Sequence, residues 1–186
     1  MSKAVMLSVR PKWCEKICSG EKTIEVRKTR PKMNTPFKCY IYCTLQGCNE
    51  FFRVDLGRDV AKWNRGKWAD RKGNVIGEFT CDRIDRLAPA NEPYGIYDID
   101  DDYVLQTCLE NGALWDYGHG TPLYGWHISN LKIYDKPREL REFKKNNRDC
   151  FYADLGLAKK DCPDCKNSGC FLERPPQSWC YVEEME

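Results

Sequence analysis

Apolar positions at the start of the chain predict a strand followed by a short helix. Residues 4–9, AVMLSV, form a continuous apolar run that is typical of a buried strand. Pro11 then suits the first position of a helix and Gly20 suits its end, so we expect two helical turns between them. The apolar face of this predicted helix carries Trp13, Cys14, Ile17 and Cys18.

Two strands are predicted next, and their faces differ. Residues 22–30, KTIEVRKTR, alternate between apolar and polar side chains, which places Thr23, Glu25 and Arg27 together on the outward face. A strand with a carboxylate and a guanidinium on one face is common at surfaces, and it is also how the floor of a cleft is built. Residues 37–44, FKCYIYCT, are apolar on both faces, which predicts a central strand.

The remaining segments complete a mixed set of short elements. We expect an insertion loop at 46–74, a strand at 75–87, a helix at about 100–111, an aromatic, glycine-rich stretch at 113–127, a strand at 128–134, a short helical stretch after Pro137 and a last strand at 178–183. Strands and helices do not alternate regularly, which excludes a doubly wound parallel sheet. The sequence therefore predicts one α+β domain over residues 1–186, built on a small mixed β-barrel with short flanking helices.

The composition is that of an ordinary globular protein. The chain has 186 residues, of which 41% are hydrophobic and 31% are charged, and this excludes a disordered chain. No apolar run approaches the roughly 18 residues that a membrane helix needs. The N-terminus also lacks the organisation of a secretion signal. We therefore expect a cytoplasmic protein that makes no use of a membrane.

Charge is unevenly distributed, although the net charge is only +2. Residues 1–40 hold ten Lys and Arg against three Glu, whereas residues 82–110 hold eight acidic side chains against two arginines. A basic segment of this kind suits an anionic partner on one face, although both segments can also be ordinary solvated surface. Several catalytic signatures are missing, namely the GxSxG elbow, the Walker phosphate loop and the GxGxxG dinucleotide loop.

One motif resembles that of a known family. Residues 20–27, GEKTIEVR, follow a predicted strand, a proline and a short helix, and they resemble the G-x-K-x-x-E-x-R signature of ASCH domains, members of the PUA-like superfamily. The later segments PFKCYIYCT, VIGEFTCDRI, WHISNLKIYDKPREL and RPPQSWCYVE agree in order. This succession looks like the small ASCH proteins of phages and bacterial mobile elements, and it covers most of residues 4–143 and 174–184.

The resemblance implies a PUA-like β-barrel with a cleft beside the first helix that binds RNA or a nucleotide-like ligand. By the motif, Lys22, Glu25 and Arg27 lie at this cleft, with Thr23 on the same strand face. A lysine and an arginine can hold phosphate, and a carboxylate can accept a hydrogen bond from a base. Bases could stack on Tyr40, or on Tyr42, Trp13 or Trp126, although core packing is the more common role of an aromatic residue.

The resemblance leaves two further functions open. Some ASCH-like proteins hydrolyse acetylated cytidine with a threonine nucleophile near the lysine, and others are described as ribonucleases. Here Lys22 and Glu25 are the candidate catalytic groups, because Glu25 occupies the position of the nucleophile and Thr23 stands two residues earlier. A hydrolase of modified nucleosides or RNA is therefore an alternative. A phage-derived protein-interaction module is a second, suggested by the tryptophans of the 46–74 loop.

Twelve cysteines form the other unusual feature of the sequence. Thiols stay reduced in the cytosol, so we expect most of them in the core. Cys162 and Cys165 form a CxxC pair that is followed by Cys170, which suits a structural Zn²⁺ site within a Cys-rich loop at 146–173, before the last strand. Cys150 is the favoured fourth ligand and Cys180 the alternative, since Cys180 lies in a predicted strand.

Overall fold

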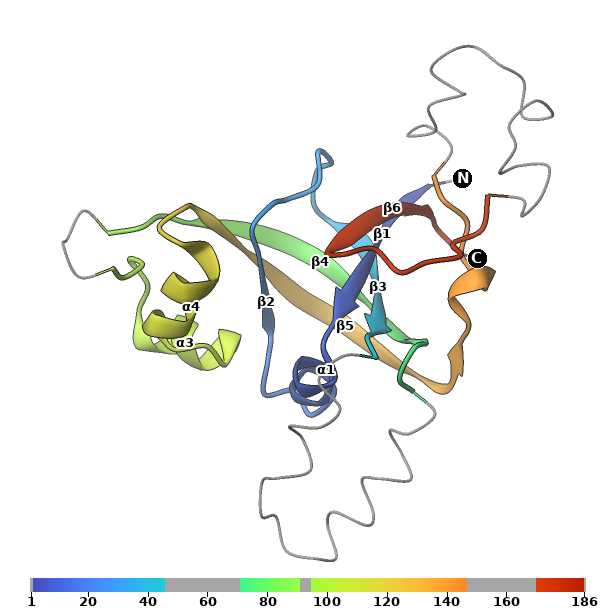
Figure 1. Ribbon diagram of the computed structural model, residues 1–186, viewed down its shortest axis with the longest axis horizontal. Helices are drawn as coiled ribbons and strands as arrows, with labels where there is room; N and C mark the ends of the chain where they lie inside the picture. The colour runs from blue at the N-terminus through green and yellow to red at the C-terminus, as the bar shows by residue number, and fades with distance from the viewer. Residues whose placement is uncertain (1, 46–70, 91–94, 147–169, 186) are drawn as a thin grey trace, which may run out of the picture. The chain divides into compact units, whose positions relative to one another are not determined.

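The computed structural model describes residues 2–45, 71–90, 95–146 and 170–185. Within these ranges the chain forms a mixed sheet with short helices (Figure 1). In chain order the elements are β1 (Lys3–Val9), α1 (Pro11–Cys18), β2 (Ile24–Arg27), β3 (Phe37–Cys43), β4 (Val75–Leu87), α3 (Asp101–Thr107), α4 (Asn111–Gly118), β5 (Leu123–Arg138), the 3-10 helix η2 (Leu140–Glu142) and β6 (Trp179–Glu183).

The strands form one six-stranded sheet in the order β2-β5-β4-β3-β1-β6. β1 pairs with β3 in parallel and with β6 antiparallel, and β2 pairs antiparallel with β5. The α+β class predicted from the sequence is therefore confirmed. Over the described ranges, however, the sheet is open, with β2 and β6 at its ends, so the predicted closure into a barrel is not seen there.

The chain divides into two compact units. Unit 1 comprises Met1–Lys12, Lys38–Glu78 and Lys132–Glu186, and unit 2 comprises Trp13–Phe37 and Phe79–Leu131. Each unit has its own apolar cluster. The cluster of unit 1 contains Ala4, Met6, Tyr40, Tyr42, Val75, Leu140, Phe143, Leu172 and Val182, and that of unit 2 contains Val26, Leu87, Tyr97, Leu114 and Leu123.

The helices of unit 2 differ from those predicted. α3 ends at Thr107 because Cys108 adopts left-handed backbone angles and donates its N–H to Leu105. α4 then starts at Asn111, just where the predicted helix was expected to end, and it runs through Gly112 into a stretch to which the sequence assigned no element. Burial of Leu114 against Tyr97 and Leu123 explains why this glycine-containing segment is helical.

The fifth strand is longer than predicted at both ends. β5 begins at Leu123, which is fully buried, and it continues to Arg138. Pro137 therefore belongs to a strand and does not open a helix, and the short helical turn follows at η2. No helix within the described ranges is both long and apolar enough to cross a bilayer.

Candidate functional site

β2 carries the motif residues, and its pairing with β5 determines which side chains share a face. Glu25 lies opposite Trp126, and Arg27 lies opposite Tyr124. Because side chains of directly paired residues lie on the same face of a sheet, Glu25 and Arg27 share a face with Trp126. All four residues of β2 are buried, so the polar face that the alternation predicted to point outward is covered.

Lys22, Glu25 and Arg27 form one buried ionic network, which we call the Lys22–Glu25–Arg27 triad. The Nη2 of Arg27 lies 2.9 Å from Oε1 of Glu25, and the Nζ of Lys22 lies 3.4 Å from Oε2. The three residues are only 2%, 6% and 7% exposed, in sequence order. Their charges thus largely satisfy one another, as an ionic group removed from water requires. The structure brings the three together in this way, and their binding role stays a prediction.

The ammonium group of Lys22 has two further neighbours. Its Nζ donates a hydrogen bond of 2.6 Å to the carbonyl oxygen of Thr107, the last residue of α3. It also lies 5.1 Å from the ring centroid of Trp13 on α1, which is within cation–π range. Burial lowers the pKa of Lys22, and the nearby charge of Glu25 opposes that shift only in part.

Thr23 faces helix α3. Its Oγ1 donates a long hydrogen bond of 3.4 Å to Oε1 of Gln106, and its backbone N–H donates to the carbonyl of the same residue at 3.0 Å. The backbone N–H of Ile128 on β5 donates to the carbonyl of Thr23 at 2.9 Å. Thr23 therefore joins β2, β5 and α3 through its backbone, while its hydroxyl contacts Gln106 and not the carboxylate of Glu25.

The four aromatic side chains that the sequence offered for base stacking are placed very differently. Tyr40 is fully buried in unit 1, where its ring packs edge-on against Phe143 at 4.9 Å between centroids and its hydroxyl accepts from the N–H of Met185. The ring is therefore enclosed in the core of unit 1, and its role in stacking stays a prediction. Tyr42 belongs to the same cluster.

Trp126 is fully buried as well, edge-on to Phe37 at 5.8 Å between centroids. Trp13 is the one of the four that remains partly exposed, and it lies beside the ammonium of Lys22. The structure thus singles out Trp13 among the candidate stacking residues.

Unit 2 contains a second polar cluster, which the sequence did not predict. Nε2 of His127 lies 2.6 Å from Oδ2 of Asp85 and 3.0 Å from Nη2 of Arg83, whose Nε lies 3.1 Å from Oδ1 of Asp85. The ring of Tyr103 packs edge-on against His127, and burial, followed by the charge of Asp85, raises the pKa of Tyr103. Asp85 and His127 are 42 positions apart, so no local pattern could have paired them.

Most of the predicted zinc ligands lie outside the residues that the structure describes. Cys150, Cys162 and Cys165 lie outside the described residues, as do Trp63 and Trp68 of the 46–74 loop.

The two remaining candidate ligands are described. Cys170 is buried and its carbonyl accepts from the N–H of Lys145. Burial raises the pKa of Cys180 to about 11, which disfavours the thiolate that zinc requires. No group of three His, Cys, Asp or Glu able to hold a metal occurs in the ranges that the structure covers, so the site stays a prediction.

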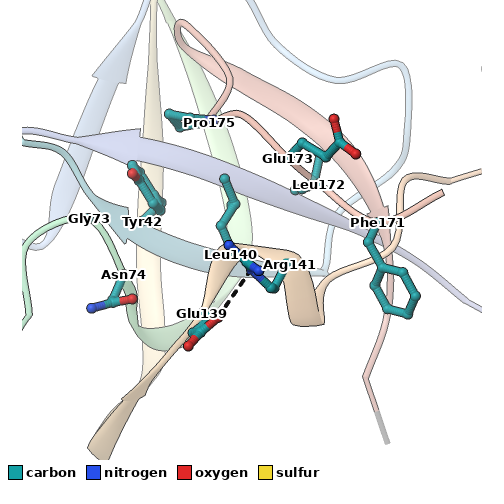
Figure 2. A pocket seen from close by; sticks show the side chains of 10 residues that line it. All are labelled: Tyr42, Gly73, Asn74, Glu139, Leu140, Arg141, Phe171, Leu172, Glu173 and Pro175. Carbon is teal, nitrogen blue, oxygen red and sulfur yellow. Dashed lines mark ion pairs between the residues drawn. The ribbon is translucent and has the colours of Figure 1, made fainter. Parts of the chain in front are cut away.

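Unit 1 contains a cavity of about 770 Å³ (Figure 2). Tyr42, Leu140 and Leu172 supply apolar lining, and Glu139 pairs with Arg141 at its rim at 3.2 Å. The side chains of this ion pair are mostly exposed, so their attraction is screened by water. Of the residues that the sequence offered for the site, Tyr42 lines this cavity, whereas Lys22, Thr23, Glu25, Arg27 and Tyr40 do not.

Comparisons with known proteins identify the fold. No family model matches the sequence, and no curated protein matches it. Among solved structures, a tyrosine-to-phenylalanine variant of the ASCH protein from Zymomonas mobilis is similar, with a TM-score of 0.54 and 18% identity over 98% of this chain and 92% of that one. A serine-to-alanine variant gives a TM-score of 0.52 and 17% identity, over 97% and 89%.

The chain has the ASCH-domain fold. The fold predicted from the GEKTIEVR motif is therefore confirmed over nearly the whole chain. At this level of identity the likeness concerns the ASCH fold alone, since one fold can carry different functions.

Proposed function

We propose that this ASCH-fold chain binds RNA or a nucleotide, and that the Lys22–Glu25–Arg27 triad recognises a base. The observation that carries the proposal is the carboxylate of Glu25, which is fixed between two cations and has a partly exposed indole, Trp13, beside one of them. A carboxylate held in this way keeps a fixed orientation, and its oxygens can accept hydrogen bonds from a base edge.

The chemistry of the triad favours a base over a phosphate group. Each carboxylate oxygen has two lone-pair directions, so Glu25 can accept from a ring N–H or an exocyclic amine while it keeps its ion pairs with Lys22 and Arg27. A phosphate would have to approach the carboxylate against like-charge repulsion. Trp13 adds a π face on which a base can stack, and such stacking contributes about 1–3 kcal/mol per base.

Fluorescence anisotropy with a labelled single-stranded RNA of about 12 nucleotides tests the proposal. We expect Glu25→Gln to weaken binding at least tenfold, since the neutral amide presents donors where the base requires acceptors. Trp13→Ala should weaken binding and Trp13→Phe should restore part of it. Glu78→Gln is the matched control, because Glu78 is a half-buried carboxylate of unit 1 that contacts Lys38 and Tyr134. Absence of RNA binding at low salt, or equal binding by Glu25→Gln, overturns the proposal.

A second candidate function, hydrolysis of a modified nucleoside or RNA, is favoured by Lys22. Burial lowers the pKa of its ammonium, which brings the group closer to the range in which a lysine can transfer a proton. Incubation with acetylated cytidine and with structured RNA tests this function. Turnover that is lost in Lys22→Met and Glu25→Gln, and retained in Glu78→Gln, supports a hydrolase. Binding without turnover supports recognition alone.

A further inference from the structure

The basic side chains of residues 1–40 differ in whether a carboxylate lies beside them. Lys16, Lys22, Arg27 and Lys38 each lie within 4 Å of a carboxylate. Lys28 and Arg30 follow β2 directly, are exposed to solvent and have no ion-pair partner among the described carboxylates. Part of the positive charge of this region is therefore paired with carboxylates, whereas Lys28 and Arg30, just after the motif, are exposed cations of unit 2.

An exposed aromatic ring accompanies this remaining charge. The Nζ of Lys28 lies 5.0 Å from the ring centroid of Tyr117, on the last turn of α4. Tyr117 is 37% exposed, and among the described residues few large hydrophobic side chains are as exposed. A cation beside an accessible aromatic ring offers two contacts at one place. The cation can bind an anion, and the aromatic ring can stack on another flat ring.

We propose that Lys28, Arg30 and Tyr117 form a strip that binds the backbone and one base of single-stranded RNA. The proposal rests on the proposed function, because the strip continues from Arg27 of the triad to the next residues of the chain. The two cations would contact phosphates, and Tyr117 would stack on a base that has left its helix. A duplex keeps its bases stacked on one another, so a single strand fits Tyr117 better.

Burial of the triad explains why a separate strip is needed. Lys22 and Arg27 are both under 10% exposed and share one carboxylate, so neither can release counterions from a polyanion without breaking an ion pair. Counterion release is the source of salt-dependent affinity for nucleic acids. The salt dependence of RNA binding should therefore come from exposed cations such as Lys28 and Arg30. The contribution of the triad to the binding free energy should change little with salt.

Anisotropy titrations at several salt concentrations test the strip, with the same RNA as probe. Each phosphate contact contributes a slope of about −0.7 in log K against log salt for a single strand, so Lys28→Ala/Arg30→Ala should make the slope shallower by roughly 1.4. Tyr117→Ala should weaken binding of the single strand without changing the slope, and Tyr117→Phe should retain it. A blunt duplex of the same sequence should be insensitive to Tyr117→Ala.

Lys132→Ala/Lys136→Ala is the matched control, because it also removes two exposed lysines, from β5 in unit 1, and should leave the slope unchanged. Circular dichroism verifies that each variant is folded.

An unchanged slope in Lys28→Ala/Arg30→Ala, or an equal change in the control, overturns the strip. If that happens while Glu25→Gln still loses binding, the proposed function stands without it. If the slope falls but Glu25→Gln binds normally, the strip stands and base recognition by the triad is wrong. Failure of the unaltered chain to bind RNA overturns both.

Discussion

The ammonium nitrogen of Lys22 lies 2.6 Å from the carbonyl oxygen of Thr107, which ties the turn before β2 to the end of α3. The carbonyls at the end of a helix have no partner within the helix, and the helix dipole favours a cation there. Lys22 thus donates a hydrogen bond to a carbonyl at the end of α3 and forms an ion pair with Glu25. Two elements 85 positions apart in the sequence are joined by one side chain.

Lys22→Ala should destabilise the fold strongly. It leaves Glu25 with one cation and the Thr107 carbonyl without its donor, and removal of one partner of a buried ion pair costs about 3–5 kcal/mol. Urea denaturation measures the loss. Lys16→Ala is the control, since Lys16 forms an exposed pair with Glu21 and should change the free energy of unfolding by less than about 1 kcal/mol. Equal stability of the two variants would contradict the description of the triad.

The free energy of unfolding should rise with pH through the contribution of Lys22. Burial lowers the pKa of Lys22 in the folded chain, so at pH values between that pKa and the value in the unfolded chain the unfolded state binds more protons. Stability then increases with pH across this window, by up to about 1.4 kcal/mol per pH unit.

Denaturation from about pH 7 to about pH 10 measures this slope, which Lys22→Met should flatten. The series ends there because tyrosines of the unfolded chain begin to ionise at about pH 10, whereas burial raises the pKa of Tyr40 and Tyr97 in the folded chain. At higher pH this difference would lower stability and obscure the contribution of Lys22. Lys16→Met should keep the slope, because its hydrogen bond to Glu21 raises the pKa of Lys16. A slope that survives in Lys22→Met would refute the assignment.

Gly125→Ala should destabilise unit 2 by about 1–3 kcal/mol, the usual cost of overpacking. A Cβ at this position of β5 would overlap the hydroxyl oxygen of Tyr103 and would lie 3.0 Å from Cγ2 of Ile24. Tyr103→Phe in the same chain should recover part of the loss, and thermal unfolding measures both. Gly112→Ala is the control, since its Cβ would meet nothing within 4 Å and alanine favours a helix. Additive effects of Gly125→Ala and Tyr103→Phe would argue against the clash.

Zinc analysis tests the Cys-rich loop. The chain should bind about one zinc per molecule, as a four-cysteine structural site would, and Cys162→Ser/Cys165→Ser should lose it. Cys150→Ser should lose it as well, whereas Cys180→Ser should retain it, because burial raises the pKa of the Cys180 thiol. A zinc content near zero in the unaltered chain removes the site.

The sequence predicted which motif side chains belong together, because their spacing on a short strand places Glu25 and Arg27 on one face. It could not predict that this face is covered. Coverage comes from α3 and β5, and Thr107 and Trp126 contribute to it from segments far along the chain. Such distant segments decide whether the polar face of an alternating strand is exposed to water. The sequence of the strand itself carries no signal of this coverage.

The roles of single aromatic and helical residues were harder to predict for a similar reason. Tyr40 and Trp13 look alike as candidates for stacking, yet one lies in a core and the other beside a lysine, and only the packing of neighbours separates them. α4 was missed because its glycines and aromatic residues give a weak helical preference, which burial of Leu114 overrides.

The left-handed backbone of Cys108, at φ 55° and ψ 29°, ends α3 and also affects the environment of Lys22. If that residue kept right-handed angles and α3 continued, the amide of Asn111 would take the carbonyl of Thr107. Lys22 would then sit in the interior facing an oxygen already engaged elsewhere. The backbone conformation of one residue outside the motif thus helps a charged lysine to be accommodated inside this protein.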